Sequence, residues 1–361
     1  MKILTFITGI GYGHTIRQRA LLDFLKNNQF LVASYQNGYY YFENKYPTIR
    51  ILGPKFPEKS GRLKILTTCL INLRLPYYYI LNLIKLKKAI RKFRPDVIIS
   101  DFEPVALYLN KNIPHFLIFN FDPEIYKEFI RVKNKKFDLQ NRYINWVYNK
   151  ARKVNCPIII PSLLGTKKYK NFYRVNPIIR ELPKDSIKDL LKKLNLRKQP
   201  IIIMLGGSHF GDRLLKKILS IIQDINEDFL IFGYKIKGKK TKNITFMPFK
   251  ENFLEYLKAS KGIITMAGHN TLSESIILKK PSLIFPIQNS LEQLINAFVM
   301  EKHNLAIINY RKNLSKKDVN SSILKFLNNL EYLQQNLSKL DIKHNGASQV
   351  YKIIKEISKS K

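Results

Sequence analysis

The alternation of apolar runs and helical patterns along the first half of the chain predicts parallel strands, each followed by a helix. Residues 2–8 form an apolar, β-rich run, which is typical of a buried parallel strand. A glycine turn at 9–13 follows it, and residues 15–26 show helical spacing. This succession is one unit of a doubly wound sheet. Further strands are predicted at 30–34, 48–52, 96–100, 115–120 and 154–160, and a charged helical stretch at 123–153.

The pattern lapses at 174–186 into prolines and polar residues, which we interpret as a linker. A second series then starts with a strand at 200–205, a glycine turn at 206–211 and a helix at 212–223. Its later strands are predicted at 228–232, 243–247, 262–266, 282–285 and 306–308. We therefore expect an α/β protein of two doubly wound domains, 1–178 and 187–340, followed by a tail at 341–361 that contains an amphipathic helix. The active site would lie in a cleft between the carboxyl ends of the two sheets.

Composition narrows the class of protein further. The 361 residues carry a formal charge of +37, which attracts anions of any kind. The lysines are scattered through every segment, so a lysine-rich bias of composition explains the charge equally well. No zinc-finger spacing or RNA-binding signature accompanies it, and we expect no nucleic-acid partner. The two cysteines, Cys69 and Cys156, have no metal-ligand spacing, and no apolar run is long enough to span a membrane. We expect a cytoplasmic protein without a signal peptide.

The most informative segment runs from Gly268 to Ala297. The predicted strand before it ends in a small-residue turn, and a helix follows with Glu274 in its first turn. A helix that opens on a glycine presents unpaired N–H groups and the positive end of its dipole, which suits a diphosphate. Glu274 could accept two ribose hydroxyls, and Glu292 with Gln293 could bind a sugar. The alternative is a capping box, in which Glu274 returns to the backbone at Thr271.

This segment resembles the donor-binding signature of GT-B glycosyltransferases. It is similar both to transferases whose motif ends in Asp-Gln-x-x-Asn-Ala and to the N-acetylglucosaminyltransferase of peptidoglycan synthesis. The resemblance implies the GT-B fold of two Rossmann-like domains, with the last helix crossing back onto the first domain. It also implies that Glu274 binds ribose and that Glu292 with Gln293 binds the donor sugar. His269, Asn270 and Thr271 lie in the turn that would meet the diphosphate.

The first glycine turn departs from the dinucleotide pattern because His14 replaces its last glycine. It matches instead the amino-terminal turn of glycosyltransferases in which a histidine opens the first helix, after Gly11 and Gly13. A helix N-terminus disfavours the imidazolium, so His14 would be available as a base for the acceptor hydroxyl. The alternative is a histidine that only caps the helix or touches a phosphate. Arg17, one turn on, could meet a diphosphate or an acidic acceptor, or could lie on a solvated face.

Two further positions follow from the resemblance. The turn that contains Gly207 and Ser208 resembles the loop that faces the donor phosphates, although a tight turn without a ligand is the alternative. Phe249 aligns with the position whose backbone reads the uracil ring. No Asp-x-Asp follows a strand, so we expect no metal and no cofactor beyond the nucleotide-sugar co-substrate. Asp101 and Glu103, after a strand, could orient the acceptor or His14, or could cap a helix.

Residues 59–95 carry many Lys and Arg, no Asp or Glu, and interleaved apolar and aromatic residues. Such a basic amphipathic stretch can lie on an anionic membrane surface. A buried helix with a solvated basic face is the alternative. The related peptidoglycan enzyme meets its lipid acceptor through an apolar and basic patch of the first domain, so the resemblance implies a lipid-linked or glycolipid acceptor and a peripheral position on the inner face of the cell membrane.

The sequence thus predicts an inverting hexosyltransferase that moves a hexose or N-acetylhexosamine from a UDP-sugar to an acceptor hydroxyl. The nearest alternative is a UDP-sugar hydrolase on the same scaffold, since residues 11–17 also resemble the G-x-G-H-x-x-R turn of such enzymes. A nucleotide-sugar 2-epimerase would require further acidic groups that the sequence does not reveal. A non-catalytic nucleotide-sugar-binding subunit is the alternative from another class, and a charge-driven nucleic-acid binder is a further one.

Overall fold

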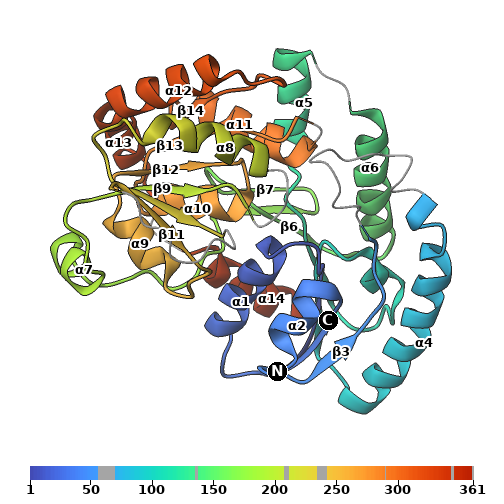
Figure 1. The fold of residues 1–361 in the computed structure, drawn as a ribbon. Coiled ribbons are helices and arrows are strands. Elements are labelled where there is room, and N and C mark those ends of the chain that lie inside the picture. The colour runs from blue at the N-terminus through green and yellow to red at the C-terminus, as the bar shows by residue number, and fades with distance from the viewer. Residues whose placement is uncertain are drawn as a thin grey trace. The chain divides into compact units, whose positions relative to one another are not determined.

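The computed structural model describes residues 1–55, 70–134, 137–206, 211–233, 242–288, 290–342 and 345–359. These residues divide into two units (Figure 1). The first takes in the described residues up to 180 together with 345–359, and the second takes in those from 181 to 342. Each unit has its own mainly parallel sheet and its own buried apolar residues.

In the first unit the described strands form an eight-stranded sheet in the order β3-β2-β1-β4-β5-β6-β8-β7, and only β7 and β8 pair in antiparallel fashion. The bounds of its strands are β1 Lys2–Ile7, β2 Gln29–Ser34, β3 Thr48–Arg50, β4 Val97–Asp101, β5 His115–Ile118, β6 Ile158–Pro161, β7 Lys167–Tyr169 and β8 Phe172–Val175. The strand order reverses between β1 and β4. In open α/β sheets this reversal marks the place where ligands bind, at the carboxyl ends of the strands.

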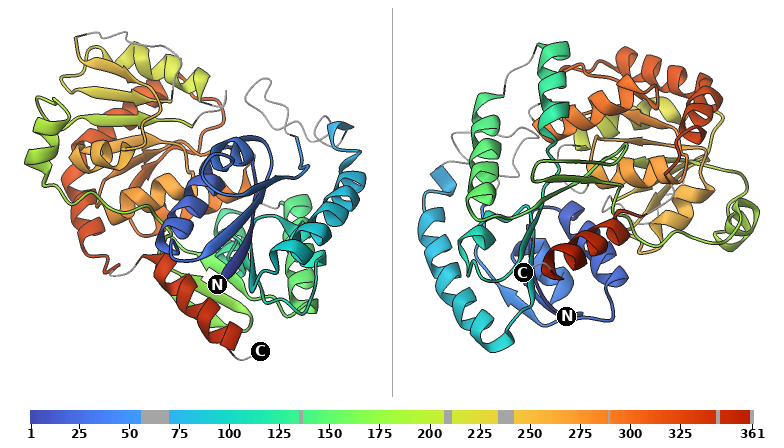
Figure 2. Two further views of the ribbon diagram at one scale, coloured as in Figure 1. Left: turned by 90° about the horizontal axis from the view of Figure 1, so that it is seen from below. Right: turned by 180° about the vertical axis from the view of Figure 1, so that it is seen from behind.

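Helices cover both faces of this sheet because side chains of a strand alternate between faces. Ile3 and Ile7 of β1 pack with residues of α1 and α14, whereas Leu4 and Phe6 pack with residues of α4. Figure 2 shows α14 beside α1. The helices of this unit are α1 Gly13–Phe24, α2 Gln36–Phe42, α4 Leu75–Phe93, the 3₁₀ helix η1 Pro104–Tyr108, α5 Pro123–Lys133, α6 Asp138–Lys153 and α14 Gly346–Lys359.

The described strands of the second unit form a six-stranded parallel sheet in the order β11-β10-β9-β12-β13-β14. Both sheets thus place their first six strands in the same order, and here the reversal lies between β9 and β12. The strands are β9 Ile201–Met204, β10 Phe229–Phe232, β11 Ile244–Met247, β12 Gly262–Thr265, β13 Ser282–Ile284 and β14 Ala306–Ile308. The helices are α7 Ile187–Lys193, α8 Asp212–Ile222, α9 Phe253–Ala259, α10 His269–Ile277, α11 Leu291–Lys302, α12 Lys316–Asn328 and α13 Leu330–Ser338.

The predicted strands are confirmed. The structure differs from the sequence prediction at three places. The helical stretch predicted at 123–153 is two helices, because Asn134 adopts a left-handed backbone (φ 47°) that ends α5. The strand predicted at 154–160 begins only at Ile158, since α6 runs to Lys153 and Asn155 is also left-handed. Residues 172–175, at the start of the predicted linker, form β8, which extends the sheet beside β6.

Candidate active site

The reversal of strand order in the first unit brings His14 and Asp101 together. His14 lies at the start of α1, after the turn that follows β1, and Asp101 is the last residue of β4. The imidazole Nδ1 of His14 is 2.8 Å from the carboxylate Oδ1 of Asp101. Because β1 and β4 are paired neighbours, their carboxyl ends place the two side chains at one edge of the sheet.

The turn before α1 explains how His14 reaches this position. Gly11 has a positive φ of 66°, which glycine adopts without the steric cost of a side chain. The helix begins at Gly13, with Tyr12 at the N-cap and no side-chain capping bond. His14 therefore lies inside the first turn and the interpretation of His14 as a helix cap is wrong. Its side chain is 17% exposed, whereas that of Asp101 is fully buried.

Asp101 is held as a carboxylate by donors from α1. Its Oδ2 accepts hydrogen bonds from Arg17 Nε and from Gln18 Nε2, each at 2.9 Å, and its Oδ1 also pairs with Arg17 Nη2. Burial opposes ionisation, but the charges and hydrogen bonds of Arg17 and His14 outweigh it and hold the pKa of Asp101 well below its usual range. The carboxylate is therefore ionised throughout the neutral pH range.

This ionised carboxylate determines which ring nitrogen of His14 carries the proton. Arg17 Nη2 also lies 2.9 Å from Nδ1, but it already donates to Asp101 Oδ1. A carboxylate oxygen only accepts hydrogen bonds, so we assign the proton to Nδ1, facing Asp101. Nε2 then keeps its lone pair, as a general base requires. Asp101 orients His14, which was one of the roles that the sequence left open. It does not cap the following helix, because η1 begins after Glu103.

Arg17 is 2% exposed, so its interpretation as a solvated residue is wrong. Its guanidinium pairs with Asp101 and donates through Nη1 to the side-chain oxygen of Asn120. Arg17 thus positions the carboxylate. Gln18 and Asn120 were not among the predicted site residues. Asn120 closely follows β5, the neighbour of β4, and this strand-end position is the sequence signal that could have identified it.

Phe102, between the two acids, has a left-handed backbone with φ 60°. Such a conformation is unusual for a bulky side chain. Hydrogen bonds fix it: Phe102 N donates to Ile118 O at 3.1 Å, and Thr8 Oγ1 donates to Phe102 O at 3.0 Å. The Phe102 ring stacks on Phe119 with centroids 4.4 Å apart, and its centroid is 5.2 Å from that of the His14 ring. Phe102 therefore forms an apolar wall beside the base.

Glu103 is a buried acid without an ionic partner among the described residues. It is 2% exposed, and within the described chain its Oε1 has no hydrogen-bond partner. Burial raises the pKa of Glu103 to about 8, against the opposing effect of a hydrogen bond from the Val105 backbone. A negative charge on Glu103 would also raise the pKa of the hydroxyls of Tyr35, Tyr79 and Tyr143. Glu103 is therefore mostly neutral at pH 7, unlike Asp101.

The second unit provides a helix N-terminus at its own reversal of strand order. Thr265 at the end of β12 donates through Oγ1 to Met204 O at the end of β9, at 2.7 Å. Helix α10 begins at His269, and Gly268 is its N-cap. Thr271 thus lies within the helix, so the predicted alternative of a Thr271–Glu274 capping box is wrong. Glu274 and His269 are buried, at 4% and 6% exposed.

The acid–amide pair of the signature lies in the first turn of α11. Ser290 caps this helix by accepting from Gln293 N, and Gln293 Oε1 accepts from Ile287 N at 3.0 Å. Glu292 is partly exposed in the same turn. Asn296 Nδ2 donates to Ala267 O at 3.0 Å and so joins α11 to the residue before Gly268. The two halves of the predicted signature are therefore held together by a buried hydrogen bond.

The remaining predicted positions are less well defined. Gly207 and Ser208 lie outside the described residues, although the preceding Gly206, with φ 78°, shows a turn that favours glycine. Phe249 follows β11 and is 60% exposed. Over the part of the chain that the structure describes, no group of three or more His, Cys, Asp or Glu side chains is arranged to hold a metal ion.

With this geometry in place, comparison with known proteins defines the class. The structure matches GT-B glycosyltransferases, including a UDP-glucosyltransferase from Polygonum tinctorium at a TM-score of 0.70, 15% identity and coverage of 100% of this chain and 99% of that one. That likeness shows the fold. The family model described as glycosyl transferase family 1 matches residues 1–182 and 186–330, so the chain belongs to this family of glycosyltransferases.

Two curated relatives cover most of the chain. An uncharacterized glycosyltransferase of Methanosarcina acetivorans is 28% identical over 337 residues, which cover 84% of each chain. The UDP-N-acetylglucosamine--N-acetylmuramyl-(pentapeptide) pyrophosphoryl-undecaprenol N-acetylglucosamine transferase of Clostridium tetani is 27% identical over 306 residues, 80% of this chain and 78% of that one. The predicted transferase class and GT-B fold are thus confirmed.

Proposed function

We propose that this glycosyltransferase inverts the anomeric centre of a hexose or N-acetylhexosamine as it moves the sugar from UDP to a hydroxyl of a membrane lipid or glycolipid. The pairing of His14 Nδ1 with the buried Asp101 carboxylate, which leaves Nε2 free to accept a proton, carries the proposal. The curated relative from Clostridium tetani, named for a UDP-sugar donor and an undecaprenol-linked acceptor, supports both substrate classes.

The proposed chemical step uses His14 as the base. The acceptor oxygen attacks the anomeric carbon while its proton passes to His14 Nε2, and the bond from that carbon to the diphosphate oxygen breaks. UDP leaves with the electron pair of that bond. Asp101 remains ionised and stabilises the imidazolium that forms. A single displacement inverts the anomeric carbon, and the proton on His14 is then released to water.

We propose that the second unit binds the donor. The N-terminal turn of α10 would receive the diphosphate, because the N–H groups at a helix N-terminus and the helix dipole favour an anion. Glu274 would bind the ribose hydroxyls, and Glu292 with Gln293 would bind the sugar. In this scheme the charge that develops on the leaving diphosphate is stabilised by the helix terminus and by His269 and Asn270, without a metal ion. Addition of EDTA should therefore leave the turnover rate unchanged.

The surface of α4 supports a lipid acceptor and a peripheral position on the inner membrane face. Leu86 and Ile90 are buried on its inner side. Tyr77, Ile80 and Ile84, at helical spacing on α4, are between 58% and 64% exposed. Leu73, in the turn before the helix, is 73% exposed. This exposed apolar stripe of α4, with Leu73 before it, indicates an interaction surface. Exposed basic residues lie on the same helix or at its N-cap: Arg74, Lys85, Lys87, Lys88 and Arg91.

Two findings limit this surface. No helix among the described residues is long and apolar enough to cross a membrane. Residues 59–69 of the predicted basic segment lie outside the described residues, so the membrane surface that we propose rests on 70–95 alone. The alternative of a buried helix with a solvated basic face accounts for the buried Leu86 and Ile90 and for the exposed lysines of α4. It does not account for the exposed side chains of Tyr77, Ile80 and Ile84.

The proposal is tested by measuring UDP release from a panel of UDP-sugars, with and without membrane lipid extract. We expect release that depends on lipid and yields a glycosylated lipid, with inversion shown by NMR of the product. Release without any acceptor would instead support hydrolysis. Binding of UDP without release under any condition would support a non-catalytic subunit and contradict the role of His14.

A further inference from the structure

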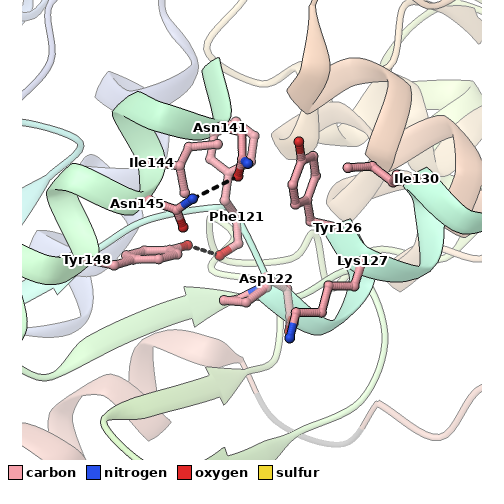
Figure 3. A pocket seen from close by; sticks show the side chains of 10 residues that line it. Phe121, Asp122, Tyr126, Lys127, Ile130, Asn141, Ile144, Asn145 and Tyr148 are labelled. Carbon is pink, nitrogen blue, oxygen red and sulfur yellow. Dashed lines mark hydrogen bonds between the residues drawn. The ribbon is translucent and has the colours of Figure 1, made fainter. Parts of the chain in front are cut away.

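A cavity of about 310 Å³ lies between α5 and α6 of the first unit. Figure 3 shows side chains of the two helices facing one another across it, with Tyr126 and Ile130 on α5 and Ile144 and Tyr148 on α6. Its volume is at the lower end of the range of small-molecule sites, which is about 300–1,000 Å³. The ten residues that line it are Phe121, Asp122, Pro123, Tyr126, Lys127, Ile130, Asn141, Ile144, Asn145 and Tyr148.

Two of the polar lining residues are engaged by the protein itself. Asp122 caps α5 by accepting from Glu124 N, and its Oδ2 accepts from Arg174 Nε at 2.6 Å. The Tyr148 hydroxyl donates to the Phe121 carbonyl (Figure 3). Because these bonds satisfy the inner polar groups, the wall presents mainly the carbon atoms of Phe121, Pro123, Ile130 and Ile144 and the aromatic rings. The interior is therefore suited to an apolar group.

Other polar groups around the cavity remain able to contact a ligand. Asn145 Nδ2 donates to Asn141 Oδ1 at 3.2 Å, so the other N–H groups and the Asn145 oxygen stay available. Lys127 is exposed, and among the described residues its Nζ makes neither a hydrogen bond nor an ion pair. A cation beside an apolar cavity is complementary to an amphiphile with an anionic group next to its chain.

The cavity also begins next to the residues that hold the proposed base, His14. Phe121 and Asp122 directly follow Asn120, whose side-chain oxygen accepts from Arg17 Nη1, and Arg17 in turn holds Asp101. We propose that this cavity binds the first part of the acceptor's apolar chain, and that Lys127 pairs with the anionic group at the head of that chain. This inference rests on the proposed lipid acceptor and adds the anionic group and the place of the chain.

Direct binding tests the cavity separately from catalysis. Butyl, hexyl and octyl phosphate would be titrated into the full chain by calorimetry, below their micellar concentrations, beside octyl glucoside and glycerol phosphate. We expect affinity to rise by about fourfold for each methylene buried, with a negative heat-capacity change. Octyl glucoside, which lacks the charge, should bind more weakly than octyl phosphate, and glycerol phosphate should not bind measurably.

Two matched pairs of variants locate the binding. Ile130→Trp fills the cavity, whereas Val132→Trp adds the same ring on α5 at a position that is 56% exposed and does not line the cavity. Octyl phosphate should lose about tenfold in affinity with the first and keep it with the second. Lys127→Ala should remove the preference for octyl phosphate over octyl glucoside, and Lys133→Ala, on the same helix, should retain it.

Equal behaviour of Ile130→Trp and Val132→Trp, or an affinity independent of chain length, would overturn the inference. A free monosaccharide could bind more tightly than octyl phosphate and lose this affinity in Ile130→Trp. That result would show that the cavity binds a sugar and not an apolar chain, and it would also overturn the inference. UDP affinity should be unchanged in all four variants. Chain-dependent binding without transfer to any lipid would leave the cavity in place and contradict only the proposed function.

Discussion

Arg17 Nε donates to Asp101 Oδ2 at 2.9 Å, although 84 residues separate the two side chains in the sequence. Both are buried, with side-chain exposures of 2% and 0%. The guanidinium supplies the charge that keeps the carboxylate ionised, and the carboxylate in turn holds His14. The Arg17–Asp101 pair therefore affects both the folding stability of the first unit and the orientation of the proposed base, His14. These two effects can be measured separately.

Arg17→Met should destabilise the first unit by about 3–5 kcal/mol, because a buried carboxylate would lose its main charged partner. Urea unfolding followed by Trp146 fluorescence reports this unit, since Trp146 is the one tryptophan in the chain. Arg19→Met is the matched control on α1. Its pair with Asp23 is exposed and should contribute less than about 1 kcal/mol. Equal losses in both variants would show that the Arg17–Asp101 pair contributes no more than a surface pair.

His14→Ala should lower kcat by about 10²–10⁴-fold, which is the usual contribution of a general base. UDP affinity and the unfolding midpoint should stay close to those of the unchanged protein, because the His14 side chain is partly exposed and Asp101 keeps its bonds to Arg17 and Gln18. The measurement is lipid-dependent UDP release under saturating donor. Retained turnover would remove His14 from the proton transfer.

Glu103→Gln should change how stability depends on pH. The folded-state pKa of Glu103 is raised from 4.5 to about 8, so its contribution to stability is fully present below about pH 4.5 and is lost as pH rises through about 8. The variant, which cannot ionise, should therefore gain stability relative to the unchanged protein between about pH 5 and 8, by a few kcal/mol. Parallel urea titrations across this range would show it, and a constant difference between the two proteins would contradict the raised pKa.

Much of this site could be predicted from the sequence pattern. The parts that could not be predicted have physical causes. The strand, glycine turn and helix around Gly11 and His14 are local features, so their order along the chain predicts them. The role of Arg17 depends on Asp101, far away in sequence, and helical spacing alone does not distinguish a buried from a solvated arginine. The neutral state of Glu103 arises from its burial in the folded protein, which no local pattern shows.

The short elements show a similar limit. The hairpin of β7 and β8 was not predicted because its three- and four-residue strands carry lysines and arginine and lack an apolar run. The division between α5 and α6 depends on the left-handed backbone of Asn134 within a continuous charged stretch. The capping box at Thr271 is a valid local pattern, but the helix already begins at His269, with Gly268 as its N-cap.

Glu274→Ala should reduce UDP affinity by about tenfold to a hundredfold, as expected for the loss of one or two hydrogen bonds to a charged group. Helix α10 should remain folded, since its N-cap is Gly268 and it begins two residues before Thr271. Ser275→Ala is the matched control at the next position, where the hydroxyl bonds only to Thr271 O of the same helix among the described residues. Calorimetric titration with UDP would separate the two variants, and equal affinities would contradict ribose binding by Glu274.

Replacement of Ile80 and Ile84 by serine should weaken binding to phosphatidylglycerol vesicles by at least about tenfold, because it removes two exposed apolar side chains from the α4 stripe. Leu324→Ser is the control, since Leu324 is 46% exposed on α12 of the second unit. Vesicle co-sedimentation at two salt concentrations gives the measurement. Turnover with a water-soluble acceptor analogue should be the same in all of these proteins.

The left-handed backbone of Phe102 has a consequence for how the proposed base works. A bulky residue in this conformation costs about 1–3 kcal/mol, which glycine would avoid. Glycine would also remove the ring that stacks on Phe119 and lies beside His14. Because that ring lies beside the imidazole, a proton taken up by His14 in the proposed reaction would have fewer routes of exchange with bulk solvent. The conformational cost at one residue would then be the condition for keeping a proton near the acceptor.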